Sequence, residues 1–324
     1  MLILNPNPCF SRTLHLEHFE RGAVMRTESA EVRAGGKGID AARVAQSLKR
    51  KAPLIVLMGD RDANEYCRLL SEEKVDFRHT TYQGSIRVAT MYLETNSTTT
   101  TIVNEEGATI SDADWTTYLV EVTREVKPGE IVACMGSFPH GVTQKSITEL
   151  VEMVHHNGSL LLMDSMPHYL AYGLSSGVDI VSPNLDEAEA VINSTTEDFF
   201  TGDNQHGQER AENAALKLCE MGAKIAIVHA GALGAAIAHA GKVSFVPSPK
   251  VTVISSVGAG DSLAAGFVLK SEKQGDVRKF DSTDWKLSLR YGVATAAAAC
   301  EKGRSGEVDP ERVSAIFHEL VKEL

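Results

Sequence analysis

Val257-Gly258-Ala259-Gly260-Asp261-Ser262 is the stretch from which the fold of this 324-residue chain can be inferred. The β-rich run 251–254 precedes it and the helix-compatible run 263–269 follows it, which predicts that a strand feeds a helix here. Bare N–H groups at a helix N-terminus can hold an anion, and an acid beside them can accept a proton. The stretch therefore indicates phosphoryl transfer, with a tight turn as the alternative.

Short apolar runs alternate with amphipathic segments through the rest of the chain. Such runs suit strands that are buried on both faces of a parallel sheet. The pattern predicts an α/β fold with a doubly wound, mostly parallel sheet flanked by helices, and with ligands beyond the carboxyl ends of the strands. Expected strands lie at the N-terminus and at 54–58, 131–135, 160–163, 180–181 and 225–228, and expected helices at 40–49, 144–155 and 209–221.

Two regions break this alternation, about 10–34 and about 84–103. Residues 87–93 alternate partly between apolar and polar side chains, and residues 98–102 are rich in threonine, which favours strands. We expect both regions to form antiparallel β-structure in a small sheet that covers a site.

Composition excludes several classes of protein. The formal net charge of −11 argues against sequence-independent binding of nucleic acid. Five scattered cysteines without a C-x-x-C pair predict buried, reduced thiols and neither a disulfide framework nor a zinc site. The N-terminus has no basic lead, and the apolar stretch 225–240 is interrupted by histidine and glycine, so we expect a cytoplasmic protein that does not enter a membrane.

A second glycine-rich stretch, Gly35-Gly36-Lys37-Gly38, precedes the expected helix 40–49. It offers bare backbone and a lysine to a ligand, or else its glycines serve only the turn. Two other nucleotide-binding patterns do not fit. Leu263 stands where G-x-G-x-x-G needs its third glycine, and Gly38 follows Lys37 where a Walker A loop needs serine or threonine.

Together the two glycine stretches resemble the signatures of the PfkB, or ribokinase-like, sugar kinase family. Three further stretches also resemble family motifs: 136–142 the G-S-L-P-x-G-V of the 1-phosphofructokinase and tagatose-6-phosphate kinase branch, 183–187 the P-N-x-x-E, and 230–234 the L-G-x-x-G. The resemblance covers nearly the whole chain. It implies a single ribokinase-like domain over residues 1–324, with a lid formed by about 10–34 and 84–103.

The resemblance implies an ATP-dependent kinase that uses Mg²⁺ and phosphorylates a hydroxyl of a sugar or of a sugar phosphate, such as a ketohexose phosphate. It also implies a homodimer through the lid. By motif position it assigns the catalytic base to Asp261 and the anion hole to Gly258, Ala259 and Gly260. The nucleotide side would comprise Asn184, Glu187 (with Mg²⁺ held through water), His229, Gly231 and Gly234, and the sugar side Cys9, Gly35, Gly36, Lys37, Asp40, Arg87 and Ser137.

The chain departs from the family pattern on the sugar side. Cys9 stands where the branch has an acid, and Asp40 and Ala89 stand where it has asparagines. Lys37 and Arg87 supply positive charge that favours a phosphorylated acceptor, although Arg87 could instead form a surface ion pair. Two alternatives therefore stay open: a kinase of an unphosphorylated sugar or nucleoside, and a sugar-binding regulatory protein without turnover.

Overall fold

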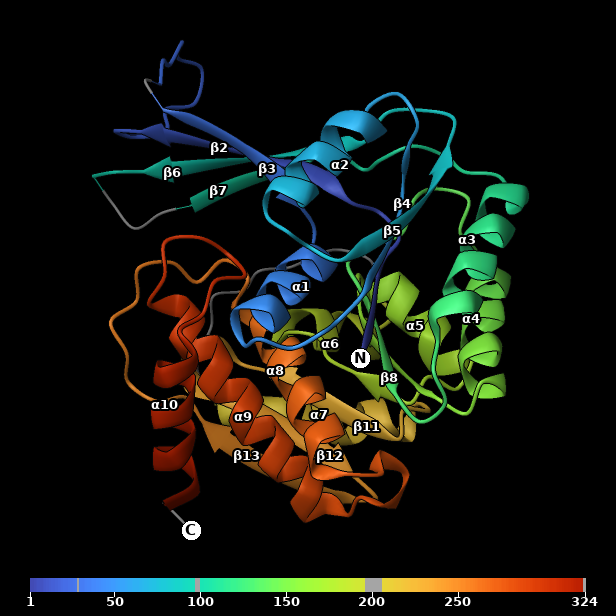
Figure 1. The fold of residues 1–324 in the computed structure, drawn as a ribbon. Coiled ribbons are helices and arrows are strands. Elements are labelled where there is room, and N and C mark those ends of the chain that lie inside the picture. Colours follow the sequence, from blue (N-terminus) through green and yellow to red (C-terminus); the bar gives the residue numbers. More distant parts are fainter. Residues whose placement is uncertain (28, 97–99, 196–205, 323–324) are drawn as a thin grey trace.

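The computed structural model describes residues 1–27, 29–96, 100–195 and 206–322. Its centre is a large sheet (Figure 1). The sheet has nine strands in the order β13-β12-β11-β10-β9-β8-β1-β4-β5. All pairs from β5 to β11 are parallel, and only β12 and β13 are added antiparallel. The strands are β1 (Leu2–Asn5), β4 (Leu54–Gly59), β5 (Phe77–Tyr82), β8 (Ile131–Met135), β9 (Leu160–Asp164), β10 (Ile180–Val181), β11 (Ile225–His229), β12 (Gly234–His239) and β13 (Lys242–Pro247).

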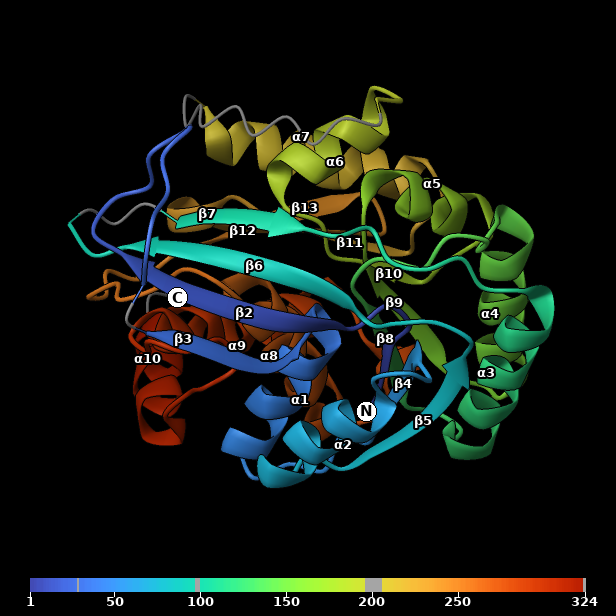
Figure 2. The same ribbon diagram turned by 90° about the horizontal axis from the view of Figure 1, so that it is seen from above.

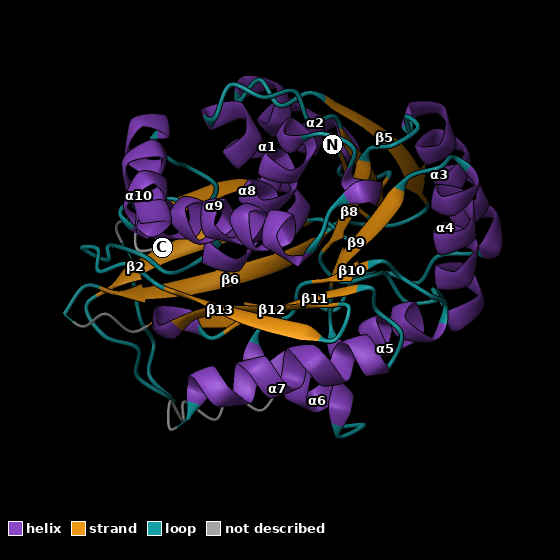
Figure 3. Ribbon diagram, turned by 90° about the horizontal axis from the view of Figure 1, so that it is seen from below, coloured by secondary structure: helices purple, strands orange, loops and turns teal. Residues whose placement is uncertain are grey.

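Helices cover both faces of this sheet and bury one apolar core on each (Figure 3). One core lies under α1 (Lys37–Ser47), α2 (Ala63–Glu72), α8 (Ala259–Gln274), α9 (Ser282–Cys300) and α10 (Pro310–Lys322). The other lies under α3 (Asp112–Glu125), α4 (Gln144–His156), α5 (Pro167–Ser175), α6 (Leu185–Ile192) and α7 (Gly207–Glu220). The two-sided burial explains the continuous apolar strand sequences, and the predicted fold class is confirmed.

A separate four-stranded sheet has the order β3-β2-β6-β7 (Figure 2). It comprises β2 (Cys9–Leu16), β3 (Ala30–Gly35), β6 (Arg87–Glu94) and β7 (Thr100–Asn104). The outer pairs are antiparallel as expected, but β2 and β6 pair in parallel, with Cys9 opposite Arg87. The reason is topological: β2 follows β1 and β6 follows β5, so both strands leave the same edge of the large sheet. Residues 28 and 97–99 of the expected regions lie outside the described residues.

The strand expected at 251–254 is wrong. The segment is not a strand, and its Val253 and Ile254 are 62% and 66% exposed. Backbone bonds instead attach it to the end of α9, where the N–H of Ile254 donates to the carbonyl of Cys300 at 2.8 Å. β-propensity alone could not reveal that the backbone of this segment bonds to the end of a helix and not to a strand.

The prediction of buried, reduced thiols is confirmed only in part. All five cysteines are free, but Cys9 and Cys134 alone are buried, whereas Cys67, Cys219 and Cys300 are half-buried. No helix in the described ranges is both long and apolar enough to cross a membrane.

Candidate active site

The turn before α8 has the geometry of an anion cradle. Gly258 is the N-cap of α8 and adopts φ +79°, a left-handed conformation that favours glycine. The Ala259 N–H donates to the Ser256 carbonyl at 3.2 Å, so it is already used. No side chain of the described residues caps this helix, and the N–H groups of Gly260 and Asp261 find no backbone acceptor among them. These two groups are left to bind an anion.

His229 lies directly against this turn. A Cβ built on Gly260 would come within 2.9 Å of His229 Cε1, so only glycine lets the imidazole and the backbone approach so closely. Burial lowers the pKa of His229, and its Nε2 has no hydrogen-bond partner in the described part of the chain. A neutral ring therefore packs beside the cradle.

Asp261 occupies the first turn of α8 and is 8% exposed. Burial raises the pKa of its carboxyl well above the ordinary value. Lys37 opposes the shift, and the negative charges of Asp164, Asp40 and Glu187 add to it. A carboxyl whose pKa lies closer to neutrality than usual is a better general base, provided that it is ionised.

Lys37 joins the two glycine-rich stretches electrostatically. Its Nζ lies 2.6 Å from Oδ1 of Asp164 and 3.6 Å from Oε1 of Glu187. Although burial opposes the ammonium form, these carboxylates and that of Asp261 raise the pKa of Lys37, which stays charged. Asp164 is fully buried at the end of β9, and its Oδ2 has no partner within the described ranges. The sequence reasoning missed Asp164, although an acid at the carboxyl end of a buried strand is a usable signal.

Asn184 and Glu187 form a capping box at the start of α6. Asn184 Oδ1 accepts from the Glu187 N–H at 2.8 Å, and Glu187 Oε2 accepts from the Asn184 N–H at 2.9 Å. The other carboxylate oxygen of Glu187 is the one that faces Lys37. The box thus fixes Glu187 and turns one oxygen toward the site.

Two asparagines before β2 contact residues that were predicted to face a sugar or that lie next to them, and neither asparagine was predicted to belong to the site. Asn5 Oδ1 accepts from the Gly38 N–H at 3.1 Å, and a Cβ on Gly36 would approach the Asn5 amide to 2.8 Å. Asn7 Nδ2 donates to Ser137 Oγ at 3.0 Å. Asn5 therefore holds the start of α1, and Asn7 orients Ser137.

Among the described residues, Arg87 bonds to backbone carbonyls and not to an acidic side chain. Its Nε and Nη2 donate to the Asn7 carbonyl at 3.3 and 3.2 Å, and its Nη1 donates to the Glu105 carbonyl at 3.1 Å. These bonds use three of the five guanidinium N–H groups, which leaves two for a ligand.

The three residues that depart from the family pattern are all buried. Cys9 is 5% exposed, and burial raises the pKa of its thiol to about 11, so it is neutral. Ala89 and Asp40 are each 8% exposed. The Asp40 carboxylate is bonded to Arg43 and Ser305.

A cavity of about 950 Å³ opens beside the anion cradle. Four of the five residues predicted for the nucleotide side line this cavity: Asn184, His229, Gly231 and Gly234. The fifth, Glu187, faces Lys37 instead. Gly260 forms part of the wall, and Val251, Val293 and Ala297 make another part apolar. The volume and the mixed lining suit a molecule of nucleotide size.

Comparison with known proteins shows which family this chain resembles in sequence and fold. Residues 5–312 match the model of the pfkB family carbohydrate kinases. The 1-phosphofructokinase of Escherichia coli K12 is 26% identical over 311 residues, which cover 96% of this chain and 94% of the relative. The tetrameric inhibited form of E. coli phosphofructokinase-2 superposes with a TM-score of 0.84 at 23% identity and coverage of 99% and 98%. Arabidopsis thaliana ribokinase, complexed with ribose and ATP, gives 0.70 at 20% identity and 98% of both chains.

Proposed function

Because the chain belongs to the pfkB family of carbohydrate kinases, it is a phosphotransferase with a hydroxyl acceptor and ATP as donor, and we propose that its acceptor is a sugar phosphate of the ketohexose phosphate class. The convergence of Lys37, Asp164 and Glu187 beside Asp261 and the anion cradle supports the transfer step. The observation that carries the proposal on the acceptor is that backbone carbonyls take only three of the five N–H groups of Arg87. Relatives named 1-phosphofructokinase support the class of acceptor.

In the proposed reaction, the acceptor hydroxyl attacks the γ-phosphorus of ATP in line. The O–P bond to the acceptor forms as the bond to the β-phosphate oxygen breaks, and ADP leaves. Asp261 takes the proton of the attacking hydroxyl. The N–H groups of Gly260 and Asp261 hold the charge on the transferring group, and Lys37 adds a fixed positive charge. Positioning and charge neutralisation do most of the work in such a loose transition state.

The carboxylates fit a magnesium ion. Mg²⁺ prefers oxygen ligands and keeps several waters, and the buried, unpartnered Oδ2 of Asp164 is an oxygen without a protein donor among the described residues. Asp164 and Glu187 would hold the ion. The sequence resemblance implies this role, through water, for Glu187 only, and Asp164 is added from the structure. When bound, Mg²⁺ neutralises charge on the phosphates of ATP.

The cavity supports the placement of ATP. Its apolar wall of Val251, Val293 and Ala297 suits a flat base, and its polar end at Asn184 and Gly260 adjoins the cradle. A nucleotide bound there would point its terminal phosphate toward Asp261.

A phosphate on the acceptor would meet Arg87. Two N–H groups of Arg87 remain available for the phosphate. Ser137 is close by, because Asn7 accepts from Arg87 through its carbonyl and donates to Ser137 through its side chain. The second candidate, an unphosphorylated sugar or nucleoside, is favoured by the fact that acids already balance Lys37 and that carbonyls occupy most of Arg87.

We also propose a homodimer in which the small sheet is the lid and pairs with its copy. Val32 on β3 and Val103 on β7 are 46% and 55% exposed. Val32 lies opposite Arg12 on β2, Arg12 lies opposite Thr90 on β6, and Thr90 lies opposite Val103. Residues that lie opposite one another in neighbouring strands point to the same face of a sheet, so Val32 and Val103 share one face. The row ends in an exposed valine on each side, with the exposed Arg12 and with Thr90 between them, and the two valines are the apolar contacts that the proposed interface would bury.

The decisive experiment is ADP release with Mg²⁺·ATP over a panel of ketohexose phosphates, unphosphorylated sugars and nucleosides. Turnover with a sugar phosphate supports the proposal, and preference for a neutral acceptor supports the second candidate. Saturable binding of a sugar without any ADP release would instead indicate the regulatory protein. The cytoplasmic location stays a prediction.

A further inference from the structure

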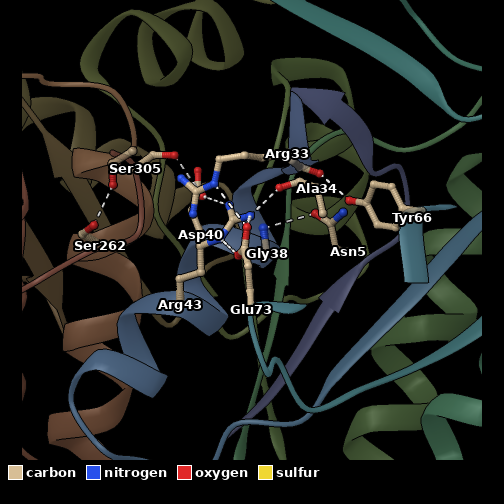
Figure 4. Close-up of polar contacts among 12 residues, drawn as sticks. Asn5, Arg33, Ala34, Gly38, Asp40, Arg43, Tyr66, Glu73, Ser262 and Ser305 are labelled. Atoms are coloured by element: carbon tan, nitrogen blue, oxygen red, sulfur yellow. Dashed lines mark hydrogen bonds and ion pairs between the residues drawn. The ribbon is translucent and has the colours of Figure 1, made fainter. Parts of the chain in front are cut away.

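Asp40 lies behind the anion cradle with its carboxylate already engaged. It belongs to the first turn of α1, and one oxygen, Oδ1, accepts from Arg43 Nη1 at 2.8 Å and from Ser305 Oγ at 3.0 Å. Figure 4 shows Asp40 between these two partners. Ser305 comes from the segment after α9, 265 residues further along the chain, so this one oxygen joins two distant parts of the fold.

Arg43 anchors Asp40 in a partly buried ionic cluster. The guanidinium, 6% exposed, donates to both carboxylate oxygens of Glu73, at 2.5 and 2.9 Å, and to the Ala34 carbonyl at 2.6 Å. Arg33 completes the cluster by donating to Glu73 at 3.2 Å (Figure 4). Two arginines thus balance two acids, and the Asp40 carboxylate is held in a fixed direction.

Ser305 and Asp40 are packed against Gly258. A Cβ built on Gly258 would come within 2.9 Å of Ser305 Cβ and 3.6 Å of Asp40 Oδ2. On the other side, Ser262 Oγ donates to the Gly258 carbonyl at 2.8 Å. Gly306 repeats the close fit, since a Cβ there would lie 2.8 Å from Arg43 Cβ. The segment 301–306 therefore fills the space between α1 and the cradle.

We propose that Asp40 is a positioning residue of phosphoryl transfer, which holds the cradle at Gly258 through Ser305, and that it is not a ligand of the sugar. The inference rests on the proposed kinase function. Its physical basis is that N–H groups stabilise a transferring phosphoryl group only when they are fixed in place before the reaction. Burial is the largest cause of the raised pKa of Asp261, Lys37 opposes it, and the charge of Asp40 adds to the shift after that of Asp164.

The test compares Asp40→Ala, Ser305→Ala, the double variant and the conservative Asp40→Asn. We expect kcat to fall about tenfold to 100-fold in both alanine variants, with the sugar KM changed less than about twofold. The double variant should be no slower than Asp40→Ala, because both changes remove one connection. Asp40→Asn should retain most of kcat, since its amide oxygen can still accept from Ser305.

Arg304→Ala is the matched control. Arg304 precedes Ser305 and forms a 2.8 Å ion pair with Glu31 of the small sheet, but both side chains are exposed, and such pairs contribute little. This variant should keep the wild-type kcat. Hydrogen exchange of the amides at 257–262 gives a readout that needs no turnover. Exchange should speed up in Ser305→Ala and Asp40→Ala and stay unchanged in Arg304→Ala.

Two results would overturn the inference: a sugar KM that rises in Asp40→Ala at constant kcat, which marks a ligand, or a Ser305→Ala variant with wild-type kcat and exchange. If the wild-type protein releases no ADP with any acceptor, the kinase proposal fails instead. The exchange measurement still decides whether Asp40 holds the cradle. Thermal unfolding of each variant separates loss of the fold from loss of position.

Discussion

Lys37 and Asp164, 127 residues apart, form an ion pair of 2.6 Å between the start of α1 and the end of β9. The pair joins the first glycine-rich stretch to the carboxyl edge of the large sheet. Asp164 is fully buried, whereas Lys37 is 34% exposed. Among the described residues, Lys37 is the only cation that forms an ion pair with this carboxylate.

Lys37→Met should remove activity and also destabilise the fold. It leaves the Asp164 carboxylate buried without a cation, and we expect a loss of about 2 kcal/mol in the free energy of unfolding. This is below the usual loss for a broken buried pair because Lys37 is partly exposed. Urea unfolding measures it, and adding Asp164→Asn should restore part of the stability without restoring turnover.

Lys224→Met is the control for that variant. Lys224 also lies 2.6 Å from a fully buried acid, Asp179, but this pair is remote from the cradle. Asp179 keeps two other partners, His155 and the N–H of Leu161, at 2.8 Å each. Lys224→Met should therefore keep full activity with a smaller loss of stability. An equal loss of turnover in both variants would contradict the role given to Lys37.

Asp261→Asn should abolish most turnover and raise the melting temperature. Loss of the base is expected to lower kcat by about 10²–10⁴. The fold should gain stability at neutral pH because the raised pKa of the buried carboxyl means that its ionised form is disfavoured in the native state. ADP release and thermal unfolding check the two parts, and a variant that keeps near-wild-type kcat would exclude Asp261 as the base.

The pH dependence of kcat/KM should show an acid limb above the pH at which an ordinary aspartate titrates. Burial raises the pKa of Asp261, Lys37 lowers it, and Asp164, Asp40 and Glu187 raise it further. Below that pKa the carboxyl is protonated and cannot accept a proton, so the rate falls as the pH falls. Asp40→Asn removes one negative charge and should move the limb to lower pH. A limb that does not move would show that the two carboxyls do not interact.

Val103→Lys should convert the proposed dimer to a monomer. The change places a charge on the exposed face of the small sheet, where burial in an interface would be unfavourable. Val120→Lys on α3 is the matched control, because Val120 is 48% exposed but lies outside that sheet. Light scattering after size-exclusion chromatography measures the mass of both variants. A wild-type protein that is already monomeric would dismiss the dimer.

Ala296→Trp should weaken the binding of ATP selectively. Ala296 lines the 950 Å³ cavity from α9, and an indole there would occupy the space assigned to the base. We expect the KM for ATP to rise about tenfold, as overpacking commonly costs 1–3 kcal/mol. The KM for the sugar is the internal control. If it rises instead of the KM for ATP, the cavity is not the nucleotide site.

The sequence was sufficient wherever a feature is local. The turn at Gly258 and the start of α8 follow from neighbouring residues, and the buried parallel strands follow from their continuous apolar runs. The run 251–254 shows the limit, because its composition is β-rich but its backbone bonds to the end of α9 and it forms no strand. Whether a segment joins a sheet depends on distant partners.

The sequence predicted which residues belong to the candidate site better than it predicted which of them contact one another. The motifs pointed to Lys37, Glu187 and Asp261, but not to Asp164. Asp164 joins the site only because the fold places the end of β9 beside the start of α1, where Lys37 lies. Asn5 and Asn7 were missed for a similar reason, since their partners Gly38 and Ser137 are far along the chain. Asp40 was expected to face the sugar, and its bond to Ser305 connects positions that no local pattern relates.

The position of β1 has a consequence for how the protein is made. β1 lies in the interior of the large sheet, between β4 and β8. While the ribosome is still translating, one edge of β1 has to remain unpaired until Ile131–Met135 has emerged. An unpaired apolar edge can recruit other nascent chains, so this interval is when the protein depends most on chaperones. A chain stalled before β8 should therefore aggregate, whereas one released after β13 already contains every strand of the sheet.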